Sequence, residues 1–345
     1  MPEQTEFEML RDEAQLVTLE PEWKALWQDD PMATPFQSPE WLLPWWRQFG
    51  GELRAVTIRH GERLVGLLPF YLYHDWRSGL RQLLLLGVGT TDYLDGVFAR
   101  ECEVADVRDA MRRLCSDGEW DAITVTQLRR ESKLRLALEE QETQGTRFEA
   151  ESCSRMRALR IDELPTKLRR NVAYYQRRAA AKGELRLTLA DESNYLDCFD
   201  MLEKFHAERW DARGERGVLA DRRMVAWHRE SLPLLLQAGL LRMCCLRLDH
   251  EPIATLYGLV DPPGRRDRTE YFYLTAHSTR HAELSPGTLL LALAIEEAAE
   301  EGVEVIDMLR GDERYKDFWH VEHTPTWGYS LSRATAPCKS AEAAA

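Results

Sequence analysis

Residues 284–319, LSPGTLLLALAIEEAAEEGVEVIDMLRGDERYKDFW, constrain the fold of this chain more than any other segment. The run Ser285-Pro286-Gly287 predicts a helix start, because serine caps helices, proline fits the first turn and a long apolar run follows. Gly302 ends this helix, and a short strand, VEVIDML, then runs into a dense charged turn. A helix whose N-terminus faces a site, followed by a strand that ends in charge, commonly binds an acyl or phosphate-bearing donor. The segment therefore indicates a transferase.

The length and apolar content of the chain indicate a protein without membrane-spanning segments. Its 345 residues suffice for two domains of ordinary size, or one large one, each with its own core. The longest apolar runs fall well short of the about 20 residues that span a bilayer. The N-terminus is acidic and lacks the apolar core of a secretory signal. We therefore expect a soluble, cytoplasmic protein.

Cysteine spacing argues against a metal-bound or disulfide-framed protein, and net charge argues against a general nucleic-acid-binding protein. The seven cysteines include no CxxC pair, so the sequence predicts neither a metal site nor a disulfide framework. The net charge of −13 opposes general affinity for nucleic acid, although a whole-chain charge conceals local patches.

A hairpin pattern occurs twice along the chain. Residues 54–73 and 242–260 each contain two β-rich runs around a charged turn. Each pair is followed by another strand, then by a helix, near 103–117 and 287–301, and then by a further strand. We interpret this as two copies of a mixed α/β unit. Chance similarity between short hairpins is the alternative.

A basic amphipathic helix is predicted between the two copies, at 164–183. It carries six basic side chains and no acidic one, and its apolar residues recur at helical spacing. One face is suited to holding phosphates, since guanidinium groups bind them in bidentate fashion; it comprises Arg170, Tyr174, Arg177 and Arg178. A solvated charged face is the alternative.

A second helix, at 195–210, brings His206, Arg209 and Trp210 to a glycine-rich loop. A histidine titrates near neutral pH and can act as a base. The alternative is that His206 packs beside Trp210 without a chemical role.

Several motifs spread over residues 15–330 together resemble a known family. They are TPFQSPEW at 34–41, VGLLP at 65–69, TDYLD at 91–95, the basic helix, Phe205-His206 with Arg209-Trp210, Ser285-Pro286-Gly287, and residues 307–316 with Trp319. In order and spacing they resemble the GNAT-related acyltransferases of the CelD type. That type is similar to the Fem-type aminoacyltransferases, which are built from two tandem GNAT-like lobes.

The resemblance implies an α/β fold with mixed sheets and two tandem GNAT-like acyltransferase lobes. We place a flexible N-terminus at 1–14, the N-terminal lobe at 15–160 and the C-terminal lobe at 161–333. The Ala-, Ser- and Pro-rich tail, 334–345, is expected to be disordered.

The resemblance also implies how a donor is bound. In the GNAT pattern the phosphates of coenzyme A bind amides at a helix start, which corresponds here to Ser285, Gly287 and Thr288. This turn lacks the usual run of glycines and basic residues. In the Fem-type branch the donor is an aminoacyl-tRNA, and an aromatic-Lys-x-x-aromatic turn lies at the acceptor site. Tyr315, with the lysine after it, begins the corresponding turn.

Lys316 and Asp307 are the catalytic candidates. Acyl transfer needs a deprotonated nucleophile and stabilisation of the oxyanion that forms. We assign Lys316 to charge stabilisation; a base of lowered pKa or a plain surface lysine are the alternatives. Strand alternation makes Asp307 a buried carboxylate that needs a partner, either Arg310 or a basic side chain of the central helix. A structural ion pair is as consistent with this pattern as a catalytic base.

The remaining candidates bind substrate. Asp92 and Tyr93 follow a strand that ends in glycines, where binding residues often occur, although Asp and Gly also serve turns. The full set of substrate-binding candidates is Asp92, Tyr93, Arg170, Arg177, His206, Trp210, Arg310, Asp312 and Tyr315.

The sequence thus predicts an N- or O-acyltransferase. We expect the acyl group to move from an acyl-CoA thioester to an amine or hydroxyl of a small molecule or of a cell-envelope or exopolysaccharide precursor. One alternative is aminoacyl transfer from charged tRNA, which is not favoured because the chain is acidic and lacks a coiled-coil arm. A non-catalytic GNAT-like binding protein is the other.

Overall fold

The structure, a computed structural model, describes residues 5–140 and 145–333. They form a mixed α/β fold with sheets of four, seven and six strands, which confirms the expected fold class. The described residues divide into two compact units that are interleaved along the chain. Unit 1 is built from 1–39, 50–150 and 326–345, and unit 2 from 40–49 and 151–325.

Unit 1 contains two of the sheets. Its elements are β1 (Thr5–Leu10), α1 (Glu13–Thr18), α2 (Glu20–Asp29), η1 (Pro35–Gln37), β2 (Glu52–Leu53), β3 (Ala55–His60), β4 (Arg63–Leu68), β5 (Phe70–His74), β6 (Arg81–Leu85), β7 (Val97–Phe98), α4 (Val104–Ser116), β8 (Ala122–Leu128), α5 (Lys133–Glu140), β9 (Thr146–Glu149) and β17 (Trp327–Ser332). The strand orders are β1-β3-β4-β7 and β2-β5-β6-β8-β17-β9. In the second of these sheets β6 and β8 run parallel, as the predicted strand–helix–strand order requires.

Two expectations for unit 1 need correction. We expected residues 1–14 to be flexible, but Thr5–Leu10 pair along their whole length with β3, and Glu13 begins a helix capped by Asp12. We also read 54–73 as a two-stranded hairpin, whereas the apolar second run divides at Pro69 into β4 and β5. The two strands lie in different sheets, and proline, which lacks an N–H, suits the break between them.

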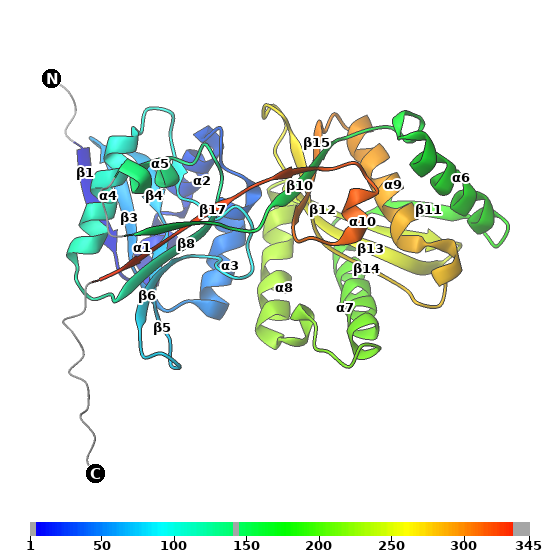
Figure 1. The fold of residues 1–345 in the computed structure, drawn as a ribbon, viewed down its shortest axis with the longest axis horizontal. Helices are drawn as coiled ribbons and strands as arrows, with labels where there is room; N and C mark the ends of the chain where they lie inside the picture. Colours follow the sequence, from blue (N-terminus) through cyan, green and yellow to red (C-terminus); the bar gives the residue numbers. More distant parts are fainter. Residues whose placement is uncertain (1–4, 141–144, 334–345) are drawn as a thin grey trace, which may run out of the picture. The chain divides into compact units, whose positions relative to one another are not determined.

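Unit 2 is built on the seven-stranded sheet. Its elements are α3 (Pro39–Phe49), β10 (Cys153–Arg157), η2 (Ile161–Glu163), α6 (Thr166–Ala180), β11 (Leu185–Leu189), α7 (Tyr195–Asp211), η3 (Val218–Ala220), α8 (Arg222–Gln237), β12 (Leu241–Leu248), β13 (Glu251–Val260), β14 (Thr269–His277), η4 (Ala282–Leu284), α9 (Pro286–Glu300), β15 (Val305–Arg310), α10 (Arg314–Asp317) and β16 (Glu322–Thr324). The strand order is β11-β12-β13-β14-β15-β10-β16 (Figure 1). Helices α6 and α9 lie over one face of this sheet.

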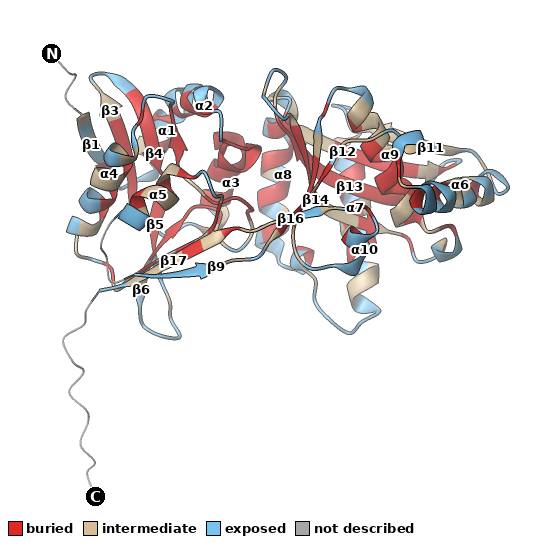
Figure 2. Cartoon of the chain, turned by 45° about the horizontal axis from the view of Figure 1, so that its top comes forward, coloured by how far each residue is buried: buried red, intermediate tan, exposed pale blue. Residues whose placement is uncertain are grey.

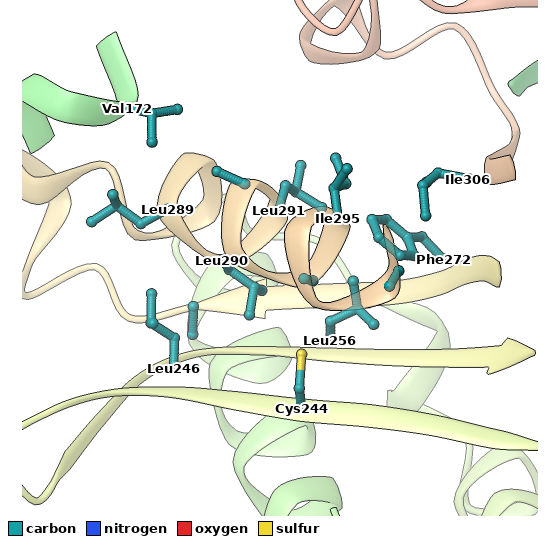
Figure 3. Close-up of a cluster of buried hydrophobic side chains, with 14 of the residues drawn as sticks. Val172, Cys244, Leu246, Leu256, Phe272, Leu289, Leu290, Leu291, Ile295 and Ile306 are labelled. Atoms are coloured by element: carbon teal, nitrogen blue, oxygen red, sulfur yellow. The ribbon is translucent and has the colours of Figure 1, made fainter. Parts of the chain in front are cut away.

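The main core of unit 2 lies between α9 and the sheet. Leu290 of α9 points toward the strands that carry Leu246 and Leu256, and Leu289 and Ile295 belong to the same cluster of buried side chains (Figure 3). Because α9 is apolar nearly all round, it is covered on its other side as well, by Leu168 and Val172 of α6. The apolar face predicted for the basic helix is thus the face that packs on α9, and the charged residues lie outside (Figure 2).

Helix α3 clusters with unit 2 although it follows the first elements of unit 1. Its Trp41 is fully buried, with its ring centroid 4.6 Å from that of Trp227 in α8, and the Trp227 indole donates a hydrogen bond of 3.2 Å to the Trp41 carbonyl. Relative to the lobes expected at 15–160 and 161–333, the structure therefore reassigns three segments. Residues 40–49 and 151–160 lie with the second unit, and 326–333 lie with the first. The tail expected to be disordered, 334–345, lies outside the described residues.

We expect Leu290→Ala to lower the free energy of unfolding by about 2–5 kcal/mol, because a buried side chain between helix and sheet is removed. Leu293→Ala, on the same helix but only partly buried, is the matched control and should cost clearly less. Denaturant unfolding followed by circular dichroism measures both. Equal losses would show that the α9–sheet contact is not the main core of unit 2.

Candidate active site

A cavity of about 660 Å³ lies within unit 2. Its walls are the N-terminal part of α6, the end of β14, the start of α9, Arg209 of α7 and the segment around α10. Of the residues proposed from the sequence, it gathers Ser285, Gly287, Thr288 and Tyr315. The cavity is therefore the candidate active site.

Strand pairing explains why space exists here. The parallel strands β14 and β15 are in register only at 269–271 with 305–307, while β14 continues to His277. The end of β14, from Thr275 to His277, lines the cavity. The connection through η4 then returns the chain so that α9 starts at the same place. Beyond their short pairing, the ends of the two strands thus leave room for a ligand.

The start of α9 forms the floor of the cavity. The helix begins at Pro286 as predicted, but Ser285 does not cap it: its side chain makes no capping hydrogen bond and instead lies 2.9 Å from the Thr288 hydroxyl. Ser285 has a φ of 49°, in the left-handed region that costs a non-glycine residue about 1 kcal/mol or more. A Cβ added at Gly287 would lie 3.3 Å from His277 Cδ2. A small residue at 287 therefore keeps the first turn open to the cavity.

Helix α6 contributes its inner edge rather than the predicted basic face. Lys167, Asn171 and Tyr175, four residues apart, line the cavity. Arg170 and Arg177 are exposed on the outside of the helix. The helix thus borders the cavity, but through a different set of residues from those selected in the sequence.

Lys316 is buried and holds together the turn after β15. Only 2% of the residue is exposed, and Nζ donates to the carbonyls of Leu309, Arg310 and Gly311 at 3.1, 2.7 and 3.1 Å. The Glu313 carboxylate lies 2.9 Å from the same nitrogen. The alternative of a plain surface lysine is therefore wrong, because three carbonyls at the end of a strand converge on its ammonium.

Asp307 is also engaged within this turn. One oxygen accepts a 2.8 Å hydrogen bond from the Leu309 amide, and the other lies 3.3 Å from Nε of Arg155 on the neighbouring strand β10. The partner proposed for it, Arg310 or the central helix, is thus replaced by Arg155. Leu309 has a φ of 58°, so the carboxylate stabilises a left-handed residue where the strand ends.

The segment that follows this turn forms the outer wall of the cavity. Tyr315, Phe318 and Trp319 line it; Trp319 is buried, whereas Phe318 is 63% exposed at the rim. Desolvation of the phenol, together with the nearby Glu313 carboxylate, raises the pKa of Tyr315 to about 12. The Tyr315 hydroxyl therefore keeps its proton throughout the physiological range.

Arg209 of helix α7 lines the cavity, whereas the predicted residues His206 and Trp210 are not part of its lining. His206 is buried, and desolvation together with the charge of Arg209 lowers its pKa, so its ring is neutral. The backbone of Gly217 packs against His206 and Trp210 so closely that a Cβ there would overlap both rings. This arrangement fits the alternative that His206 packs beside Trp210 without a chemical role.

The other predicted binding residues lie away from the cavity lining. Arg310 is 3.8 Å from Glu151, and Asp312 is an exposed residue of the turn. Asp92 and Tyr93 belong to unit 1 and are buried there, where the Tyr93 carbonyl accepts a hydrogen bond from the Gln37 side chain. Tyr93 has a φ of 51°, and the Arg129 guanidinium lies 5.4 Å from its ring centroid.

Cations outnumber anions around the cavity. Lys167 and Arg209 line it, and Asp317 is the acidic member of the lining. Neither Lys167 nor Arg209 forms a salt bridge with any residue that the structure describes. The cavity is therefore suited to an anionic organic ligand.

Residues 5–140 and 145–333 contain no group of three or more His, Cys, Asp or Glu side chains able to hold a metal. No helix among them is long and apolar enough to cross a membrane.

Sequence reasoning missed most of the cavity wall. It did not select Lys167, Asn171, Thr275 or His277, whose signals are weak because each stands alone in a strand or helix. Arg209 lies three residues after His206 and next to Trp210, so helical spacing alone does not separate it from these selected residues. The tertiary fold alone shows that these positions share one space.

We expect Lys316→Met to lower the free energy of unfolding by roughly 2–4 kcal/mol, because three buried carbonyls lose a charged donor. Lys204→Met, at an exposed lysine of α7, should stay within about 0.5 kcal/mol of the parent. Chemical denaturation of both variants provides the measurement. A loss no larger than that of the control would mean that the turn does not depend on the ammonium.

Comparison with known proteins agrees with this arrangement. Residues 166–317 match the family described as an acetyltransferase (GNAT) domain. No curated protein sequence matches the chain. The solved structure of FemX has a TM-score of 0.65 at 11% identity, covering 91% of this chain and 96% of that chain.

Two further solved structures share the fold. L-PGS from Bacillus licheniformis has a TM-score of 0.59 at 10% identity, covering 91% of each chain. A tandem GNAT protein from the clavulanic acid biosynthesis pathway has a TM-score of 0.51 at 14% identity, covering 96% of this chain and 100% of that chain. Residues 166–317 are thus similar in sequence to a GNAT acetyltransferase domain, and the whole chain has a fold similar to those of FemX and the tandem GNAT protein.

Proposed function

We propose that this protein transfers an acyl group from a thioester of pantetheine, carried by coenzyme A, to an amine or hydroxyl. The single observation that carries the proposal is the cavity at the start of α9, inside the segment that matches a GNAT acetyltransferase domain. Its volume, about 660 Å³, is in the range of pockets that bury a cofactor-sized ligand. The acceptor fits the class expected from the sequence, a small molecule or a cell-envelope precursor.

The start of α9 provides the place for the phosphates of the donor. A helix N-terminus carries unpaired amides and a partial positive charge, and both favour an anion. Gly287 lets a phosphate approach the backbone, and Lys167 and Arg209 add positive charge at the same cavity. The missing glycine run of the common pattern is thereby replaced by one glycine and two side chains from other helices.

Apolar side chains provide the place for the pantetheine arm and the acyl group. Leu168, Leu290, Leu291 and Trp319 line the inner part of the cavity and are buried. Burial against such side chains stabilises an uncharged arm in proportion to the apolar area removed from water. The cavity thus offers both positive charge for an anion and an apolar lining, as an acyl thioester of coenzyme A requires.

The chemistry needs an acid for the leaving group. The acceptor attacks as a neutral amine or a hydroxyl: its nitrogen or oxygen forms a bond to the carbonyl carbon and loses one proton to water, and the carbon–sulfur bond breaks. Tyr315 lines the cavity and stays protonated, so we propose that it gives its proton to the departing thiolate. Lys316 and Asp307 are proposed to act indirectly, by fixing the turn from which Tyr315 projects.

Aminoacyl transfer from charged tRNA is the second candidate. It is favoured by the exposed arginines of α6 and by the structural similarity to FemX. Affinity that rests on phosphates falls steeply as salt rises. Binding of deacylated tRNA that is lost between 50 and 200 mM salt, together with no response to any thioester, would replace our proposal with this one.

We expect Gly287→Val to abolish the thermal stabilisation that coenzyme A and acetyl-CoA give the parent protein. The added side chain meets His277 and covers the first turn of α9. A ligand at about 100 times its Kd stabilises by roughly 2.7 kcal/mol, so a thermal-shift assay detects the loss. Glu300→Val, at the opposite end of α9, is the control and should keep the response. A response that survives Gly287→Val would place the donor elsewhere.

We expect Tyr315→Phe to lower kcat by about 10²-fold while the KM for the thioester changes little, because only the proton donor is lost. The parent enzyme should show no loss of activity from deprotonation of Tyr315 below about pH 11, since its raised pKa keeps the hydroxyl protonated. Release of the free thiol, measured across pH with an amine acceptor, tests both statements. An unchanged kcat would exclude Tyr315 as the acid.

A further inference from the structure

The outer face of α6 carries a stripe of arginine and tyrosine side chains, which we call the basic stripe. It consists of Arg170, Tyr174, Arg177 and Arg178. Arg170 and Arg177 are exposed, and Tyr174 is 47% exposed. The residues recur every three or four positions, so they form one continuous face along the helix.

The charges of the basic stripe are not neutralised by the fold. Arg170 and Arg177 form no salt bridge with a residue within 5–140 or 145–333. The Arg178 guanidinium lies 5.6 Å from the Tyr174 ring centroid and donates a 3.2 Å hydrogen bond to its hydroxyl. Arginine and tyrosine are enriched in protein interfaces, and an ordered arginine–tyrosine pair loses little side-chain entropy on binding.

The same helix borders the candidate active site. Lys167, Asn171 and Tyr175 line the cavity, and Arg170 lies one turn after Lys167. From Arg170 to Arg177 the helix advances by about 10 Å, which is two turns. A partner that lies along the stripe would therefore have its end at the mouth of the cavity.

We propose that the basic stripe is the docking surface for a small acidic carrier protein, which brings the acyl group to the cavity as a thioester of its phosphopantetheine arm. The inference rests on the proposed function and names a second source of the same thioester. The arm enters the cavity between α6 and the start of α9, and an acidic helix of the carrier lies along the basic stripe.

Charge and extent favour this partner over a nucleic acid. The chain has a net charge of −13 while the helical segment 164–183 holds six basic residues and no acidic one, so attraction is confined to one face. An RNA needs a broad positive footprint and many phosphate contacts. A carrier protein needs only a small, transient interface, which two turns of one helix can supply.

The reaction with a carrier balances as it does with coenzyme A. The acceptor nitrogen or oxygen forms a bond to the carbonyl carbon, and the bond from that carbon to the sulfur of the arm breaks. The sulfur takes the proton of Tyr315, so the carrier leaves as the free thiol; the acceptor loses one proton to water, and Tyr315 regains one from water. No oxidant, metal or nucleotide is consumed.

Binding of an acidic acyl carrier protein of the bacterial fatty-acid type tests the proposal, measured by titration calorimetry at 50 mM salt. Three probes are compared: the carrier with a hydrolysis-resistant acyl thioether on its arm, the apo carrier without the arm, and coenzyme A bearing the same acyl thioether. The variant is Arg170→Glu with Arg177→Glu. Its matched control is Arg222→Glu with Arg266→Glu, at two exposed arginines elsewhere on unit 2.

We expect the loaded carrier to bind the parent protein, and the α6 variant to weaken this binding at least about tenfold, while its affinity for the coenzyme A analogue changes less than about twofold. The control variant should bind both as the parent does. Equal weakening of both ligands would overturn the inference, since the stripe would then hold the nucleotide. Binding of the coenzyme A analogue without binding of the carrier would also overturn it and would leave the proposed function intact. Binding of neither would refute both.

Discussion

The contact between the Lys316 ammonium and three carbonyls at the end of β15 organises the candidate site. The strand ends in two residues with positive φ, Leu309 and Gly311, whose carbonyls turn toward one point. An ammonium has three donors and no acceptor, so it can satisfy all three oxygens at once. Without it, buried carbonyls at the end of a strand would lack partners, at a cost of about 1–3 kcal/mol each. The turn that it stabilises carries Tyr315 and Trp319 to the cavity.

The short parallel pairing of β14 with β15 leaves room for the cavity. Because only three positions are in register, the last part of β14 is available to the cavity, and α9 begins opposite it. The same helix packs its apolar side chains on the sheet and on α6 (Figure 3). One helix therefore joins the main core of unit 2 to the anion-binding end of the proposed site, so core stability and site geometry depend on the same contacts.

The basic helix shows how far sequence reasoning reaches. Its position and its apolar face were predictable, because both follow from helical periodicity within one segment. Its contribution to the cavity was not: the selected Arg170 and Arg177 lie outside, while Lys167 and Asn171 line the cavity. Periodicity tells which residues share a face, but not which neighbour that face meets. Asp307 is a second case, since its partner Arg155 is distant in sequence and comes from an adjacent strand.

The sequence by itself determined the class of fold, the helix start at Pro286, the strand–helix–strand order around it and the resemblance to GNAT-related proteins. These features are local, because capping preferences, alternation and turn residues act within a few positions of each other. The tertiary structure decided that residues 40–49 lie with the second unit, that Lys316 is buried and that Ser285 adopts a left-handed conformation. Each of these depends on partners far away in the chain, and packing between distant segments is not encoded in the pattern of any one of them.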